Sequence, residues 1–293
     1  MNDFEKASGT GPRLRWLRLA LMVAVLGQFS APGEILPDQP LPGVIISFET
    51  RTNPPERLFI AEVDLTNPKI HLRVAPGGPD PDGPGKWETT LLEPTKIAER
   101  DKLDFVINGD FFTAKGVNDG EGTNSHFAAH QWAWTAGVAV TDGQPWSAGT
   151  NARPSLVVHQ DNTVTIEMLQ HAQPDDWDVI SGNVMLVHNG QLVTHANAQR
   201  HPRTVVGLDA SGHKLTVLVV DGRKPGIAAG MSYDELGSEM LRRGCKEALN
   251  LDGGGSSVMA VRDTSGKMNI LNQPTDGHER AVANVLGITI DQK

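Results

Sequence analysis

The sequence has very few of the residues on which several common kinds of site depend. Cys245 is its only cysteine, so the chain can form neither an intramolecular disulfide nor a cysteine-based zinc site. Basic clusters are lacking beyond the N-terminus and the formal net charge is -9, which disfavours a nucleic-acid partner. What is present, 39% hydrophobic and 21% charged residues with 31 glycines, is typical of a soluble protein rich in loops.

A short apolar run near the N-terminus indicates export. Residues 19–27 (LALMVAVLG) follow Arg13, Arg15 and Arg18, which is the order of basic and apolar regions in a secretory signal peptide. The run is too short for a comfortable membrane span, which takes about 20 apolar residues. We therefore expect export to the periplasm or the exterior, with cleavage near Ala31. An uncleaved N-terminal anchor is the alternative, and no cysteine follows the run to carry a lipid.

The rest of the chain is expected to form one domain. We assign residues 1–31 to the signal peptide or anchor, 32–42 to a proline-rich linker, and 43–293 to a single folded domain. At about 150 residues per domain the length allows one large domain or two small ones.

Regularly spaced strand and turn signals predict an α+β fold, a mostly antiparallel sheet system with helices packed on it. Asp142-Gly143 and Asn189-Gly190 are strong turn signals. A helix is predicted over residues 94–100, and a second begins at a capping box of Ser232 and Glu235 and ends at Gly244. The predicted strands lie at residues 44–48, 58–64, 70–74, 105–107, 137–140, 156–158, 164–168, 181–187, 201–209, 215–220 and 281–290.

One loop combines features that suit a reaction site. Residues 250–257 (NLDGGGSS) lie between two apolar runs, which predicts a strand, a tight polar loop and a strand. Three consecutive glycines lose much conformational freedom on folding, so they indicate that another group approaches the backbone closely. Free N–H groups and two hydroxyls suit an anion, and Asp252 suits proton transfer or a cation. A plain glycine-rich hairpin is the alternative interpretation.

Polar residues follow two other apolar runs, which is how open sheets present a site at their strand ends. Asn108 and Asp110 follow residues 105–107, and Asp221 follows residues 215–220.

Several common catalytic and phosphate-binding motifs do not match the sequence. A hydrolase nucleophile elbow at Ser256 needs glycine two residues later, where Val258 stands. The HExxH zinc motif does not occur, and the triple glycine lacks the lysine of a phosphate-binding P-loop.

Five short segments occur in an order that resembles the phosphodiester glycosidase family. They are NGDFF at 108–112, HPRT at 201–204, VVDGR at 219–223, NLDGGGSS at 250–257 and ERAVAN at 279–284. The likeness covers roughly residues 100 to 290, and an ordered set of motifs is far more specific than any single one. Asp110 and Ala281 depart from the pattern, since a small residue and a proline are common at these positions.

The resemblance implies an exported bacterial hydrolase that cleaves the anomeric C–O bond of a sugar-1-phosphodiester. The substrate would be of the polysaccharide (exopolysaccharide), glycolipid or nucleotide-sugar type. The family's cysteine-rich animal extensions are absent, and so are N-x-[ST] sequons, which suits a bacterial protein. We expect no required cofactor, although a divalent cation is compatible with the acids. Carbohydrate phosphodiesters are the expected partners, and a membrane only through an N-terminal anchor.

The expected roles follow from the chemistry of the bond. An oxocarbenium-like transition state favours two carboxyl groups facing the sugar, and Asp252 and Glu279 are the preferred pair, with Asp110 and Asp221 in reserve. A phosphate leaving group is already acidic, so it needs charge neutralisation more than a strong general acid. The groups expected to bind the phosphate are Arg203, Arg280 and the loop residues Gly253, Gly254, Ser256 and Ser257. Asn108 and Asn284 are expected to hydrogen-bond sugar hydroxyls.

Two other functions fit the same residues. One is a phosphodiesterase that cuts the P–O bond with a metal held by Asp110, Asp221 and Asp252. The other is a non-catalytic envelope module that binds polysaccharide phosphates.

Overall fold

The computed structural model describes residues 34–35, 41–122 and 126–291. The chain divides between Ala31 and Pro32, and the second unit contains all the described residues. The signal peptide or anchor predicted for residues 1–31 lies outside them and stays a prediction. None of the described helices combines the length and the hydropathy that a membrane crossing requires.

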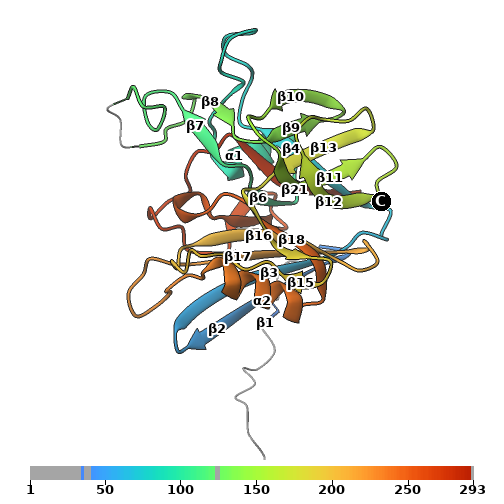
Figure 1. Cartoon of the computed structure of the whole chain (residues 1–293), viewed down its shortest axis with the longest axis vertical. Helices are drawn as coiled ribbons and strands as arrows, with labels where there is room; N and C mark the ends of the chain where they lie inside the picture. The colour runs from blue at the N-terminus through green and yellow to red at the C-terminus, as the bar shows by residue number, and fades with distance from the viewer. Residues whose placement is uncertain (1–33, 36–40, 123–125, 292–293) are drawn as a thin grey trace, which may run out of the picture. The chain divides into compact units, whose positions relative to one another are not determined.

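An eight-stranded antiparallel sheet carries the segments that lead into the candidate site (Figure 1). Its strand order is β1-β2-β3-β17-β16-β18-β14-β15. The bounds are β1 (Glu34–Ile35), β2 (Val44–Thr52), β3 (Pro55–Asp64), β17 (Lys214–Val220), β16 (Arg203–Asp209), β18 (Cys245–Asn250), β14 (Val184–His188) and β15 (Gln191–Leu192). The predicted Asn189-Gly190 turn connects β14 to β15, and both residues have positive φ as such a turn requires.

Three smaller antiparallel sheets complete the described fold. The first, in strand order, contains β20 (Met268–Ile270), β19 (Met259–Arg262), β6 (Phe105–Asn108), β21 (Asn284–Ile290) and β4 (Ile70–Pro76). The second contains β10 (Gln144–Ala148), β9 (Val138–Thr141), β13 (Asp176–Ser181), β11 (Arg153–His159) and β12 (Val164–Leu169). The third contains β5 (Thr89–Thr90), β8 (Trp132–Thr135) and β7 (Phe112–Ala114).

Strand β17 shows why the large sheet is buried on both faces. Its side chains alternate between two cores, because successive residues of a strand point to opposite faces. Leu215, Val217 and Val219 pack with apolar residues of β4, β6, β19 and β21, whereas Leu218 and Val220 pack under α2 (Tyr233–Arg242). The large sheet therefore lies between the other sheets and α2 (Figure 1).

Helices contribute less than the predicted α+β class implies. Besides α2, the described residues contain only one further α-helix, α1 (Pro94–Asp101), and a short 3-10 turn, η1 (Gly254–Ser256). Helix α1 packs on the outer face of β6 and β21 through Ile97 and Ala98. The mostly antiparallel sheet system is confirmed, but the fold is closer to all-β than to α+β. The capping box of α2 is also confirmed, since Ser232 and Glu235 each satisfy the other's backbone N–H.

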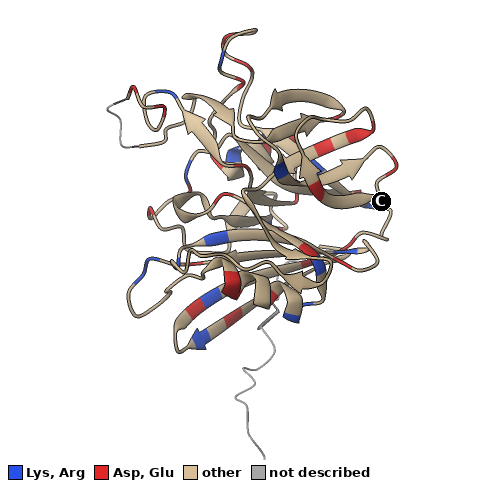
Figure 2. Cartoon of the chain, viewed as in Figure 1, with Lys and Arg blue, Asp and Glu red and all other residues tan. Residues whose placement is uncertain are grey.

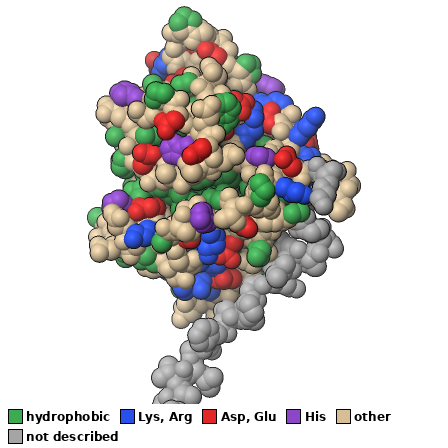
Figure 3. All heavy atoms as spheres, turned by 90° about the vertical axis from the view of Figure 1, so that its right-hand side faces the viewer, with side chains coloured by type: hydrophobic (Ala, Val, Ile, Leu, Met, Phe, Trp, Pro, Cys, Tyr) green, Lys and Arg blue, Asp and Glu red, His purple; other side chains and the backbone are tan. Residues whose placement is uncertain are grey.

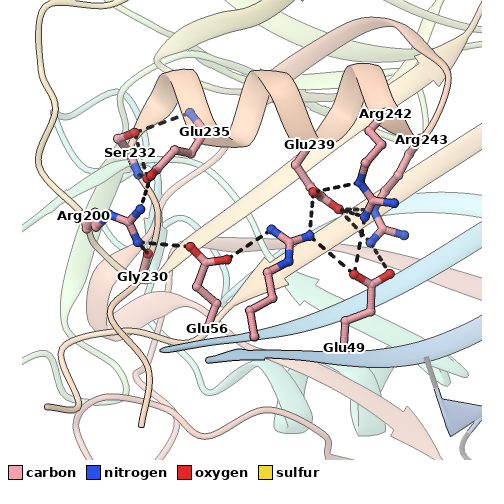
Figure 4. A network of polar contacts seen from close by, with 10 residues as sticks. Glu49, Glu56, Arg200, Gly230, Ser232, Glu235, Glu239, Arg242 and Arg243 are labelled. Atoms are coloured by element: carbon pink, nitrogen blue, oxygen red, sulfur yellow. Dashed lines mark hydrogen bonds and ion pairs between the residues drawn. The ribbon is translucent and has the colours of Figure 1, made fainter. Parts of the chain in front are cut away.

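A network of ion pairs fastens α2 to the sheet beneath it (Figure 4). Acidic and basic residues lie close together on β2 and α2 (Figure 2). The buried carboxylate of Glu239 contacts the guanidinium groups of Arg51, Arg242 and Arg243. Burial alone would raise the pKa of Glu239, but hydrogen bonds and charges from these arginines outweigh it and hold the pKa at about 2. The ion-pair network comprises Arg51, Arg200, Arg242, Arg243, Glu49, Glu56, Glu235 and Glu239.

Candidate active site

The Asp252 loop lies against the start of β16. Strands β18 and β16 pair so that Val205 is opposite Asn250, which carries the chain beyond β18 past residues 202–204. The Leu251 N–H donates to the Thr204 carbonyl (2.9 Å), and the Gly254 N–H donates to the Pro202 carbonyl (2.9 Å). The register of two strands thus brings Asp252 beside Arg203.

Side chains larger than hydrogen would not fit at the glycines of this loop. A Cβ on Gly253 would lie 2.8 Å from the Pro202 carbonyl oxygen, and one on Gly255 would lie 1.9 Å from an Arg280 guanidinium nitrogen. Gly254 has φ +64, a conformation that residues with a side chain rarely adopt. The close approach expected from the triple glycine is therefore the approach of neighbouring backbone and of arginine side chains.

A pocket of about 200 Å³ opens at this loop. It brings together segments that are far apart in the sequence, and three of its lining residues are arginines. Asp252 is its only carboxylate-bearing lining residue. The lining comprises Phe111, His201, Arg203, Arg223, Asp252, Gly253, Gly254, Gly255 and Arg280.

Arg203 is the buried cation of the pocket. Its residue is 6% exposed, and its guanidinium lies 4.2 Å from the centre of the Tyr233 ring. Its polar contacts are long ones to two backbone carbonyls, from Nε to Met231 (3.3 Å) and from a terminal nitrogen to Gln199 (3.4 Å). Within the described part of the chain it forms no ion pair with a carboxylate. Burial lowers its pKa and outweighs the nearby charge of Asp252, which acts in the opposite direction.

The other two arginines lie nearer the solvent. Arg280 is half-buried, pairs with Asp276 at 2.8 Å and stacks over Phe127. Arg223 is exposed, and one of its terminal nitrogens lies 3.5 Å from Nδ1 of His201. Burial and the charges of Arg203 and Arg223 lower the pKa of His201, so this imidazole is neutral at pH 7. The pocket therefore carries a surplus of positive charge.

Asp252 is half-buried, and burial raises its pKa to about 6. Its Oδ1 accepts a hydrogen bond from the Gly253 N–H (2.8 Å), and the charges of Arg280 and Arg203 also favour ionisation. The hydroxyl of Ser256 lies near the carboxylate and favours its charged form, although its geometry falls short of a hydrogen bond. Such a carboxylate is mainly ionised at pH 7 and close to its titration range, which suits proton transfer.

The side chains of Asn108 and Asn284, for which contacts with sugar hydroxyls were predicted, are fully buried and already paired within the protein. Asn108 donates to the Asp252 carbonyl (2.7 Å) and accepts from Thr204 Oγ1 (2.7 Å) and the Val258 N–H (3.2 Å). Its role is to hold the Asp252 loop in place. Asn284 instead joins β21 to Asp110.

Neither reserve acid lines the pocket. The buried carboxylate of Asp110 accepts hydrogen bonds from Asn284 Nδ2 (2.6 Å) and from the Ser181 N–H. Burial raises its pKa well above the usual value. Asp221 accepts from Asn272 (3.2 Å) and the Gln273 N–H (3.0 Å) and lies 3.2 Å from Arg57 Nε. Both carboxylates thus have polar partners within the described protein and lie outside the lining of the pocket.

Glu279, the preferred partner of Asp252, is absent from the pocket lining as well. Its carboxylate accepts hydrogen bonds from the Thr95 N–H (3.0 Å) and the Thr95 hydroxyl at the start of α1. The N-cap residue of that helix, Glu93, makes no capping hydrogen bond with its side chain. Glu279, which is 184 residues from Thr95 in the sequence, accepts the hydrogen bond in its place. The predicted Asp252–Glu279 pair is therefore not assembled in this pocket.

Most of the loop amides are not free for a ligand either. Gly253, Gly254, Ser256 and Ser257 donate their N–H groups within the protein, and of the five residues 253–257 only Gly255 has an N–H with no acceptor in the described part of the chain. The hydroxyl of Ser257 is buried and lacks a partner among the described residues. The positive charge of the pocket thus comes mainly from its arginines.

Outside the Asp252 loop, three lining residues were missed as site residues: Phe111, His201 and Arg223. Each stands inside one of the five motifs, directly beside or near a predicted residue. Membership of a motif was therefore the signal available for them.

The chain was compared with protein families, curated proteins and solved structures. The family model for phosphodiester glycosidase matches residues 101–289. The SPbeta prophage-derived uncharacterized protein YomE of Bacillus subtilis is 40% identical over 100 residues, which span 34% of this chain and 14% of that protein.

Two solved structures share the fold. The catalytic domain of zebrafish N-acetylglucosamine-1-phosphodiester alpha-N-acetylglucosaminidase, auto-inhibited by its pro-peptide, has a TM-score of 0.59 at 22% identity, covering 85% of this chain and 82% of that one. A protein of Burkholderia pseudomallei K96243 that is thought to be exported has a TM-score of 0.56 at 17% identity, covering 80% and 74%. At these identities the likeness concerns the fold alone.

Proposed function

This chain belongs to the phosphodiester glycosidase family, and from that premise we propose that it hydrolyses the anomeric C–O bond of a sugar-1-phosphodiester. The substrate is of the polysaccharide, glycolipid or nucleotide-sugar type. We also propose that the protein acts after export, through the N-terminal segment described above. The thought-to-be-exported protein of similar fold supports this location.

The observation that carries the proposal is the presence of Arg203 and Asp252 in one pocket, without a direct ion pair between them in the described structure. A phosphodiester carries one negative charge, and the phosphate leaving group gains a second when the C–O bond breaks. A buried guanidinium without a carboxylate partner is placed to stabilise that added charge, and Arg223 and Arg280 extend the positive surface toward solvent.

Asp252 then serves the sugar side of the bond. Its carboxylate stabilises the positive charge that develops at the anomeric carbon and accepts a proton from the attacking water. The water oxygen bonds to the anomeric carbon, and the electrons of the broken C–O bond go to the phosphate oxygen. Because that oxygen is acidic, it leaves without prior protonation. A second carboxylate, the role predicted for Glu279, is not required.

The first test is kinetic and uses the two acids that the sequence paired. Asp252→Asn should lower kcat/KM on a UDP-sugar or another sugar-1-phosphodiester by a thousandfold or more. Glu279→Gln should stay within about tenfold of the wild type, because its carboxylate caps α1. Near-normal turnover by Asp252→Asn would remove the assignment. A substrate panel with reducing-sugar detection would identify the sugar.

The second test separates the proposal from its two rivals. Hydrolysis in ¹⁸O-water should place the label in the sugar, whereas label in the phosphate would show P–O cleavage by a phosphodiesterase. The geometry gives little support to that rival, because Asp110, Asp221 and Asp252 have separate partners and do not converge as a set of ligands within the described residues. Binding of a sugar phosphodiester with no turnover would instead indicate a polysaccharide-binding module.

A further inference from the structure

A second group of side chains, which could bind a metal ion, lies where strands β11 and β13 pair. Strands β11 and β13 are antiparallel partners, and their register sets His159 opposite Asp176. A bulge between Val158 and His159 shifts the register there, and bulges commonly re-aim a side chain. On the face of the protein that Figure 3 shows, histidine side chains (purple) lie directly beside acidic ones (red). None of the residues His159, Asp175 and Asp176 lines the pocket that contains Asp252.

The hydrogen bonds of Thr165 fix the tautomer of the His159 ring. The Thr165 hydroxyl donates to the Glu167 carboxylate (2.9 Å), since an ionised carboxylate can only accept. The same hydroxyl oxygen lies 2.9 Å from Nε2 of His159 and must therefore accept from it. Nε2 therefore carries a proton, which leaves Nδ1 as the ring nitrogen able to bind a cation. An outer partner that fixes the ring in this way is usual for histidines that bind metals.

The Nδ1 atom of His159 faces two carboxylates instead of a donor. Nδ1 lies 3.6 Å from Asp175 Oδ2 and 3.9 Å from Asp176 Oδ1, and it is buried without a hydrogen-bond partner among the described residues. The Asp176 side chain is only 1% exposed, and its other oxygen, Oδ2, accepts the Gln173 N–H (2.7 Å). Three acceptor atoms thus converge, all within 4.8 Å of one another. Such an arrangement is repulsive unless a metal cation lies between the three atoms or Nδ1 carries a second ring proton.

The spacing suits a transition-metal ion. Zinc binds histidine nitrogen and carboxylate oxygen at about 2.0–2.2 Å, which places two tetrahedral ligands roughly 3.4 Å apart. The observed separations of 3.6 and 3.9 Å need only a slight contraction to reach that value. A histidine nitrogen among the ligands favours zinc-like ions over calcium or magnesium, which prefer oxygen ligands.

We propose that His159 Nδ1, Asp175 and Asp176 bind one zinc-like divalent ion, with water completing the coordination. The ion joins the end of β11 to the start of β13 and the residue before it, so the site is structural and independent of the proposed hydrolase activity. Asp175 is 71% exposed at its side chain, which leaves the ion an open route of entry.

The test is zinc binding by isothermal titration calorimetry, with the full chain first freed of metal by a chelator. The wild type should bind one ion per chain. Asp175→Asn, which changes an exposed side chain and leaves the fold intact, should lower the affinity at least tenfold. His159→Gln should abolish binding, and His171→Gln should behave as the wild type because this exposed histidine of the same region is not in the group.

Two results would overturn the proposal. One is a wild type that takes up no zinc, which would mean that His159 is protonated and forms an ion pair with the two aspartates. The other is an Asp175→Asn or His159→Gln variant that binds zinc as tightly as the wild type.

Discussion

Two groups of arginines in this protein differ in how many carboxylates lie among them. In the ion-pair network around α2, four arginines meet four glutamates, and the buried acid Glu239 contacts three of the arginines. In the pocket, three arginines share a lining with one aspartate, and the most buried arginine has no carboxylate partner in the described part of the chain. The charges of the network balance, whereas the residues that line the pocket carry more positive than negative charge.

The difference separates a structural use of arginine from a functional one. A buried charge without a partner is destabilising, and proteins retain such a charge mainly where a ligand supplies the partner. Arg203 is in this position, because aromatic stacking and long contacts to carbonyls hold it without neutralising it. An anionic phosphodiester bound in the pocket would neutralise Arg203, as Glu239 neutralises arginines of the network.

Between the two groups of arginines, the largest expected difference is in activity. Arg203→Met removes the charge and keeps much of the side-chain volume, so kcat/KM on a sugar-1-phosphodiester should fall by about 10²–10³-fold. Arg242→Met in the network is the matched control, and its kcat/KM should stay within about threefold of the wild type. Equal losses in both variants would remove the distinction between the two groups.

The next effect is on stability. Glu239→Gln removes the more buried of the two carboxylates, Glu239 and Glu49, that contact Arg51, Arg242 and Arg243. The loss of its charge-assisted hydrogen bonds should lower the free energy of unfolding by about 2 kcal/mol. Urea denaturation at pH 7 measures this loss, and kcat/KM of the folded variant should be unchanged. A variant as stable as the wild type would show that the network contributes little.

The two acids should also respond to pH with opposite signs. The pKa of Glu239 is depressed from 4.5 to about 2, so its contribution to stability is present above pH 4.5 and is lost as the pH falls toward 2. The pKa of Asp252 is raised from 3.8 to about 6, so ionisation of Asp252 reduces stability as the pH rises from 3.8 to 6. Asp252→Asn should therefore have a higher Tm than the wild type at pH 7.

The activity profile gives a second readout of Asp252. The kcat/KM of the wild type should fall about tenfold per pH unit below pH 6, as Asp252 becomes protonated. In Glu239→Gln, kcat/KM should show the same decrease below pH 6. A flat profile between pH 4 and 7 would be inconsistent with Asp252 as the base.

The smallest expected effect concerns Glu279. Its replacement by Gln weakens the cap of α1, which should lower the free energy of unfolding by about 1 kcal/mol. The Tm measures the change. A loss of activity as large as that of Asp252→Asn would restore Glu279 to the reaction.

Local signals explain which parts of the fold the sequence could predict. The Ser232–Glu235 capping box and the Asn189-Gly190 turn depend on residues close in the chain, and both occur as expected. The Asp252 loop was recognisable because three glycines and an acid stand between apolar runs. Helix content was overestimated, since the described strands greatly outnumber the helices.

The partners of buried polar groups could not be read from the sequence. Glu279 and Thr95 are 184 residues apart, and Asn284 and Asp110 are 174 apart, so only the tertiary fold shows that these polar groups satisfy one another. Arg223 was missed for a related reason, since its place in the pocket depends on the turn after β17, where its φ is +56.

The most direct test of the central claim is binding of methyl phosphate, measured by calorimetry on the wild type, Arg203→Met and Arg242→Met. Because methyl phosphate carries the charge of the leaving group but no sugar, it probes only the unpaired arginines. The wild type and Arg242→Met should bind it with the same Kd, and Arg203→Met should bind at least tenfold more weakly. An Arg203→Met variant with the wild-type Kd would contradict the account.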